Sequence, residues 1–162
     1  MADITYSGVA TERRAQGGIV YGKGDAANVK EVAATKSIPS GTAAGSTFKF
    51  VRIPANARIS GLSEVHWDDL DNSNDTMLSV GLASVDSNIT SDDDALTSSL
   101  DTSSAGSANL IGDHANFGKR AWEHVSGQST DPSGSLDLYI TTKDHATDVT
   151  GDVSVIVQYT LD

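Results

Sequence analysis

Several features that would indicate particular functions are absent from the sequence. Its 162 residues include no cysteine, which excludes disulfides, thiolate metal sites and a cysteine nucleophile. Only 11 residues are Lys or Arg against 22 Asp or Glu, and the formal net charge is −11. Nucleic acids and anionic membranes are bound by clustered Lys and Arg, so the sequence predicts neither as a partner. The N-terminus lacks the apolar core of a signal peptide and no run of about eighteen apolar residues occurs, which predicts a soluble chain made in the cytoplasm.

Motifs that carry catalysis or cofactor binding are also missing. The four histidines, His66, His114, His124 and His145, show neither HxH nor HxxxH spacing, so they do not predict a zinc site. No GxSxG segment marks an activated serine, and the glycines form neither GxGxxG nor GxxxxGK. The sequence therefore predicts no catalytic residue and no cofactor, and we expect a protein that is not an enzyme.

The residues that are abundant favour short strands joined by turns. Hydrophobic residues make up 38% of the chain, and the acidic residues are 18 Asp but only 4 Glu. Aspartate is frequent in turns and caps, whereas glutamate is typical of helix surfaces. This balance predicts an all-β protein whose acidic groups lie on loops.

The clearest local pattern spans residues 48–82. Residues 48–53 are rich in aromatic and β-branched side chains and end at Pro54, which cannot donate to a sheet ladder. Residues 58–67 place Ile59, Val65 and Trp67 on one face, and residues 76–82 alternate again after an acidic turn. Three consecutive strands with short connections predict a β-meander.

Further strands are predicted on either side of this region. Residues 29–38 are compatible with a strand, and residues 135–142 and 152–161 alternate clearly between apolar and polar side chains. A strand is also predicted around residues 120–125, after a surface loop over 101–108. Six or more short strands whose apolar faces need covering predict a β-sandwich, and at this size a jelly roll.

One short helix is predicted at residues 91–100. Ser91 can act as an N-cap, and Asp92, Asp93 and Asp94 would lie near the positive end of the helix dipole. The Ser- and Thr-rich sequence that follows predicts that this helix ends near Leu100.

The first 28 residues differ from the rest of the chain. They are rich in glycine, and their apolar residues show no period, so residues 1–28 are predicted to be an extended N-terminal arm and residues 29–162 a single domain. Arg13 and Arg14 make the arm locally positive, and we expect them to contact an acidic partner or a second copy of the chain. The alternative is a solvated tail whose two arginines have no partner.

An acidic turn contains a weak calcium motif. Asp69, Asp71, Ser73 and Asp75 stand at alternate positions, as ligands do in the first half of a calcium loop. The second half of the motif is missing, because Val80 stands where the bidentate glutamate belongs. The alternative is a solvated acidic turn without a metal.

Residues 50–59, FVRIPANARI, followed by Leu78-Ser79-Val80-Gly81-Leu82, resemble a pattern in small virion proteins of tailed bacteriophages. In that family a hydrophobic–Pro–x–Gly–Ala–x–Ile turn precedes a Leu–x–Val–Gly strand, and Asn56 here replaces the usual glycine, which asparagine can do at positive φ. The resemblance covers residues 46–84 well and the rest only in layout. It implies a jelly-roll-like capsid decoration, or cement, protein on the outer surface of a phage head, without catalytic residues.

Such a protein would have the major capsid protein as its partner. Copies would also contact one another, most naturally as a homotrimer at a local threefold position, where one set of contacts repeats around a closed ring. An alternative is a carbohydrate- or receptor-binding module of a tail tip or fibre, in which exposed Trp67, Trp122 or Tyr139 would stack on sugars. A cellular β-sandwich of unrelated role is the remaining alternative.

Overall fold

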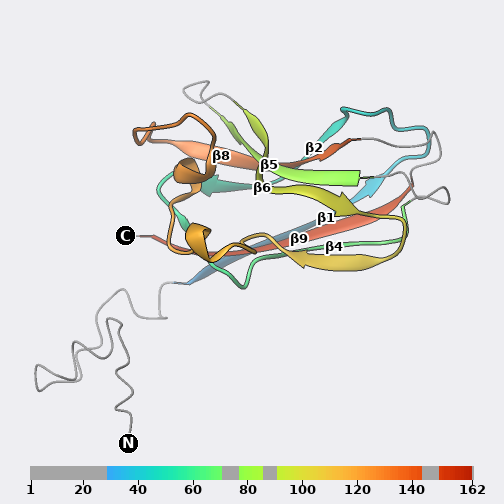
Figure 1. Ribbon diagram of the computed structural model, residues 1–162, viewed down its shortest axis with the longest axis horizontal. Coiled ribbons are helices and arrows are strands. Elements are labelled where there is room, and N and C mark those ends of the chain that lie inside the picture. Colours follow the sequence, from blue (N-terminus) through green and yellow to red (C-terminus); the bar gives the residue numbers. More distant parts are fainter. Residues whose placement is uncertain (1–28, 71–76, 86–90, 144–149, 162) are drawn as a thin grey trace, which may run out of the picture.

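A computed structural model describes residues 29–70, 77–85, 91–143 and 150–161, and in it the chain forms two antiparallel sheets packed face to face (Figure 1). The first sheet has the strand order β1-β9-β4-β7, with the short β3 paired to β9, and the second has the order β2-β8-β5-β6. The prediction of an all-β sandwich is confirmed. The strands are β1 (Lys30–Ile38), β2 (Thr47–Pro54), β3 (Arg58–Ile59), β4 (Glu64–Trp67), β5 (Met77–Ser84), β6 (Asp92–Asp101), β7 (Gly106–Asn109), β8 (Ser135–Thr142) and β9 (Gly151–Thr160).

The strands pair in a nested order. β1 pairs with β9, β2 with β8, β4 with β7, and β5 with β6. The chain thus resembles one long antiparallel ribbon whose successive strand pairs lie alternately in the first and second sheets. This arrangement is a jelly roll, as the sequence predicted.

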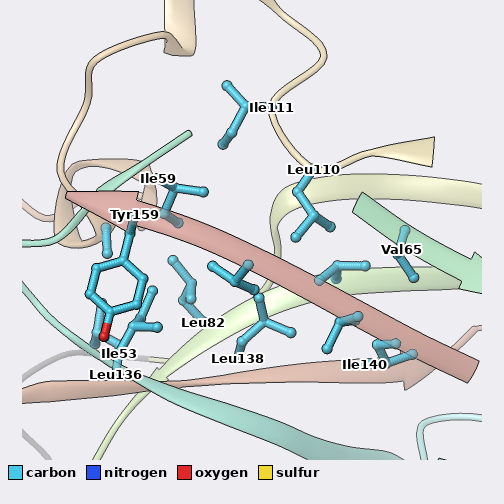
Figure 2. Close-up of a cluster of buried hydrophobic side chains, with 14 of the residues drawn as sticks. Ile53, Ile59, Val65, Leu82, Leu110, Ile111, Leu136, Leu138, Ile140 and Tyr159 are labelled. Carbon is cyan, nitrogen blue, oxygen red and sulfur yellow. The ribbon is translucent and has the colours of Figure 1, made fainter. Parts of the chain in front are cut away.

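The core lies between the two sheets and is formed by the side chains that alternate inward. Val80 of β5, Leu138 of β8 and Val155 of β9 are each fully buried. Figure 2 shows Leu82, Leu138 and Ile140 among the apolar side chains that meet between the sheets. The inward faces predicted for β4, β5, β8 and β9 are therefore confirmed. The main buried residues are Ile53, Ile59, Val65, Trp67, Leu78, Val80, Leu82, Leu136, Leu138, Ile140, Val153, Val155, Val157 and Tyr159.

The predicted β-meander over residues 48–82 is wrong. β2 and β5 belong to the second sheet with β8 between them, and β4 belongs to the first sheet. Residues 58–67 are not one strand, because a turn at residues 60–63 separates β3 from β4. Ser63 stabilises this turn by donating its hydroxyl to the Gln158 carbonyl of β9, 3.1 Å away. Pairing with the C-terminal strands β8 and β9 decided the arrangement, and local turn signals carry no information about such distant partners.

The predicted helix at residues 91–100 is also wrong, because β6 occupies this segment. β6 pairs with β5 through Leu82–Asp92, Val80–Thr97 and Leu78–Leu100, with an irregular excursion between the first two pairs. The pattern that predicted the helix involves only neighbouring residues. The free edge of the buried strand β5, in contrast, provides a row of backbone N–H and C=O groups with which β6 forms hydrogen bonds. Tertiary pairing overrode the capping pattern.

Two smaller corrections concern the connection between β6 and β8. Part of the predicted loop at 101–108 is β7, and the predicted strand at 120–125 is the 3₁₀ helix η2 (Ala121–His124), which follows a similar turn, η1 (His114–Asn116). The predicted arm, residues 1–28, lies outside the described residues. Among the helices in the described part of the chain, none is long and apolar enough to cross a membrane.

Candidate interaction surfaces

The outer face of the second sheet carries an acidic cluster where β6 begins. The carboxylate oxygens of Asp92, Asp93 and Asp94 lie within 4.8 Å of one another. The backbone of this segment crosses closely over Gly81 of β5, where a Cβ would lie 2.2 Å from the Asp92 carbonyl oxygen. Glycine at position 81 is what allows β6 to arch over the sheet here.

The acidic cluster affects the groups around it. A hydrogen bond with Asp92, followed by burial and the charges of Asp92 and Asp93, raises the pKa of Asp94. Burial, together with the three carboxylates, raises the pKa of Tyr139 to about 12. Lys143 compensates part of the charge, because its Nζ lies 2.5 Å from Asp93 Oδ2. The three aspartates therefore form an acidic surface whose charge is partly compensated by Lys143.

A second polar group lies at the β2 edge of the same sheet. Asp137 of β8 is buried beneath two exposed cations, with Arg52 Nε at 2.7 Å and Lys49 Nζ at 3.0 Å from its carboxylate. The Arg52 hydrogen bond lowers the pKa of Asp137 against the opposing effect of burial, and Lys49 adds to the lowering. A β-bulge between Lys49 and Val51 places Phe50 beside this pair, and the residues border a shallow hollow of about 380 Å³.

The residues predicted to bind partners or calcium lie largely outside the described part of the chain. This holds for Arg13 and Arg14 of the arm and for Asp71 and Asp75 of the acidic turn. Asp69 is described and lies exposed just after β4. Both the arm contacts and the calcium loop therefore stay predictions.

The described histidines lie on separate elements. His66 of β4 is within 3.0 Å of Glu64 Oε2 on the same strand, and His114 is exposed beside Asp113. Burial, assisted by the charge of Lys119 and opposed by that of Glu123, lowers the pKa of His124 to about 4, so this imidazole is neutral at pH 7. His145 lies outside the described residues.

The aromatic rings considered for sugar stacking are buried. Trp67 and Trp122 are each 9% exposed and Tyr139 is 6% exposed. Trp67 packs against Gly106 of β7 and donates its indole N–H to the Ser104 carbonyl at 3.0 Å. The expectation of exposed rings at these three positions is wrong, because all three serve the packing of the sandwich.

One end of the sandwich is closed by the connection between β7 and β8, residues 110–134. Backbone hydrogen bonds tie it to the segment around β3: Leu110 donates to Ser63 at 2.9 Å, and Ala121 donates to Ala57 at 2.7 Å. Residue 29, which follows the predicted arm, lies at the same end, because β1 and β3 flank the last residues of β9. We call this the arm-proximal end; in Figure 1 it holds η1, η2 and the start of β1.

Apolar side chains are exposed at the arm-proximal end. Leu62, in the turn between β3 and β4, is 70% exposed, and Phe117, just after η1, is 56% exposed. They belong to one surface, because the Phe117 ring lies over Gly61, where a Cβ would be 2.4 Å from Phe117 Cε1. Arg58 lies at the border of this surface, where its guanidinium donates to the Gly118 carbonyl. We call Gly61, Leu62 and Phe117 the apolar patch; the sequence patterns did not single it out, because isolated apolar residues in turns have no period.

Known structures share this fold. No family model matches the chain, and no curated protein does. A chain in the structure titled "Cyanophage Pam1 capsid asymmetric unit" matches with a TM-score of 0.58 and 18% identity, over 91% of this chain and 96% of the other. A chain in "Capsid of Ralstonia phage GP4" matches with a TM-score of 0.58 and 15% identity, over 82% of this chain and 85% of the other. The fold is one found in phage capsids.

These matches run nearly from end to end. Since the alignment to the Pam1 chain covers almost all of both molecules, that chain is close in size to this one. The likeness to the Pam1 chain therefore concerns most of the fold and not one part of it. At 15% to 18% identity it establishes the fold, and it agrees with the fold implied by the resemblance at residues 46–84.

Proposed function

We propose that this chain is a virion structural protein that decorates the outer surface of a tailed-phage head. The observation that supports the proposal most strongly is the end-to-end match of its fold to a similarly sized chain of a phage capsid structure. The resemblance in residues 46–84, which points to small head-associated proteins, rests on a different kind of evidence. Together they favour a capsid role over the tail-fibre alternative, whose proposed stacking rings are buried.

The action proposed for the protein is mechanical. A rigid sandwich that contacts two neighbouring shell subunits adds interface area that must be broken before the shell opens. Its major capsid protein partner would then be stabilised by mass action, without any chemical step. Three copies around a local threefold position would present the same contacts to each shell subunit, so we also propose a homotrimer.

The test is to add the purified chain to heads of its source phage that lack it. We expect the chain to sediment with the heads, to label their surface regularly in immunogold electron microscopy, and to raise the temperature at which they release DNA. Sedimentation velocity of the free chain would report the trimer. Labelling confined to the tail would overturn the proposal and restore the receptor-binding alternative, and absence from the virion would overturn any virion role.

A further inference from the structure

The exposed large hydrophobic residues are distributed unevenly over the surface of the jelly roll. Four large hydrophobic residues are exposed in the described chain: Val29, Leu62, Met77 and Phe117. Three of them lie at the arm-proximal end, and Met77 begins β5 at the other end of the sandwich. An exposed apolar surface costs solubility, so its concentration at one end points to a binding surface.

The apolar patch has the anatomy of a small protein interface. Leu62 and Phe117 form the apolar centre, and Phe117 supplies a large ring with few rotatable bonds. Cations stand around it: Arg58 is bound to the Gly118 carbonyl, and Lys119 Nζ lies 2.8 Å from Asn116 Oδ1. Two acids of the same connection are held by backbone groups of their own turns, since Asp113 accepts from Ala115 N at 3.0 Å and Glu123 accepts from Arg120 N at 2.6 Å.

Val29, the first described residue, lies at the same end of the sandwich. Residues 1–28 contain three basic residues, Arg13, Arg14 and Lys23, and three acidic ones, so the arm is neutral while the rest of the chain carries the whole net charge of −11. The arm joins the sandwich at Val29, which is 47% exposed and lies at the arm-proximal end. Val29, which follows this neutral segment in the sequence, therefore lies at the same end of the sandwich as the apolar patch.

We propose that the arm-proximal end is the face that docks on the shell, with Leu62 and Phe117 as its anchors. The inference deepens the proposed function and rests on it. The surface that we expect to bind the apolar patch is an apolar depression with an acidic rim on the outer surface of the major capsid protein. Such a depression would match the apolar centre of the patch, and its acidic rim would match the charges of Arg58 and Lys119. Docking by this end directs the acidic opposite end, and its carboxylates, toward solvent.

The first test compares three variants for binding to heads that lack the chain. We expect Leu62→Ser and Phe117→Ser each to weaken binding about thirtyfold, as truncation of a buried interface anchor does. Met77→Ser is the matched control, because Met77 is 40% exposed at the opposite end, and its binding should equal that of the original chain. Urea unfolding of each variant separates lost binding from lost folding.

The outcomes distinguish the inference from the proposed function. Unchanged binding of both patch variants, while the original chain binds, would overturn the inference and leave the decoration role intact. Failure of the original chain to bind heads would overturn both.

A second measurement identifies the occupant directly. A photoreactive benzophenone amino acid in place of Phe117 should crosslink to the major capsid protein when the chain is bound to heads. A crosslink to another copy of this chain, or to residues 1–28 of the same copy, would overturn the inference by assigning the patch to a different contact. The same probe in place of Met77 should give no crosslink to the shell.

Discussion

The arm-proximal end of the sandwich and the opposite, distal end are built from the same strands but expose different chemistry. At the arm-proximal end, Leu62 and Phe117 are exposed over a backbone tied together by hydrogen bonds. At the distal end, where β4 ends and β9 begins, four carboxylates are exposed: Asp68, Asp69, Asp101 and Asp152. Several of these cap backbone groups, as Asp68 does for the Asp152 N–H at 3.0 Å.

The two ends also differ in how their buried tryptophans are held. Each end carries one buried tryptophan: Trp122 at the arm-proximal end and Trp67 at the distal end. The distal ring has a hydrogen-bond partner, the Ser104 carbonyl, whereas Trp122 Nε1 is buried without one among the described residues. Each end also holds other buried polar atoms without a partner among these residues: His124 Nε2 at the arm-proximal end, and Ser79 Oγ and Thr141 Oγ1 toward the distal end. A buried polar atom without a partner costs stability, so the two tryptophan rings, and not the two ends as a whole, differ in how well they are stabilised.

The largest expected effect comes from truncating each tryptophan. Trp67→Ala and Trp122→Ala should each lower the free energy of unfolding by about 3–5 kcal/mol, because a large buried ring is replaced by a cavity. Trp67→Ala should cost more, since it also leaves the Ser104 carbonyl without its donor. Urea denaturation measures both, and a larger loss for Trp122→Ala would reverse our ranking of the two rings.

A smaller effect is expected from adding one methyl group at each end. In Gly106→Ala the new Cβ would lie 2.8 Å from the buried Trp67 ring, which has no room to move, so we expect a loss of about 1–3 kcal/mol. In Gly61→Ala the obstacle is the exposed Phe117 ring, which can rotate away, so we expect a loss below about 0.5 kcal/mol.

Gly61→Ala should nevertheless weaken binding to heads, because Phe117 would leave its place on the patch. Equal loss of stability in both alanine variants, measured by urea denaturation, would show that Phe117 is held as firmly as Trp67.

The smallest effect concerns pH. The pKa of His124 falls to about 4 on folding, so below its ordinary value of 6.5 the unfolded chain binds more protons and stability declines as the pH falls toward 4. At the distal end, hydrogen bonds from Ser103 lower the pKa of Asp101, so its stabilising contribution is present above 3.8 and is lost only in stronger acid.

We therefore expect the urea midpoint to fall by about 0.5 M between pH 7 and pH 5, and to fall less in His124→Gln. A fall of the same size in His124→Gln would assign the pH dependence to other groups. Asp101→Asn is the control for the distal end and should behave like the original chain over this pH range.

The sequence predicted the strands whose side chains alternate most regularly. β5, β8 and β9 lie where apolar residues recur at every second position, because a strand that buries one face needs an apolar side chain at each inward position. The failures lie at residues 91–100 and 58–67. At the first, three aspartates suggest a helix start, but their segment instead arches over Gly81. No local pattern predicts this contact between β5 and β6. At the second, Gln158 of β9 fixes a turn inside an expected strand.

The candidate site was less predictable than the fold. Arg13, Arg14, Asp71 and Asp75 were selected by local charge patterns and lie outside the described residues, so those predictions stand untested. Leu62 and Phe117 are separated by more than fifty positions, and what brings them together is the set of backbone hydrogen bonds between the β3 region and residues 110–134. Each residue alone looks like an ordinary apolar residue in a turn.

The sequence by itself determined the acidic, cysteine-free composition, the all-β class and the inward faces of the main strands, because these depend on residue type and on a period of two. Tertiary structure decided which strands are neighbours, that β6 replaces the expected helix, and that three of the four exposed large hydrophobic residues of the described chain lie at one end. The reason is physical: strand partners are chosen by backbone hydrogen bonds and buried area between segments up to about 130 residues apart, as β1 and β9 are, and these energies outweigh local preferences.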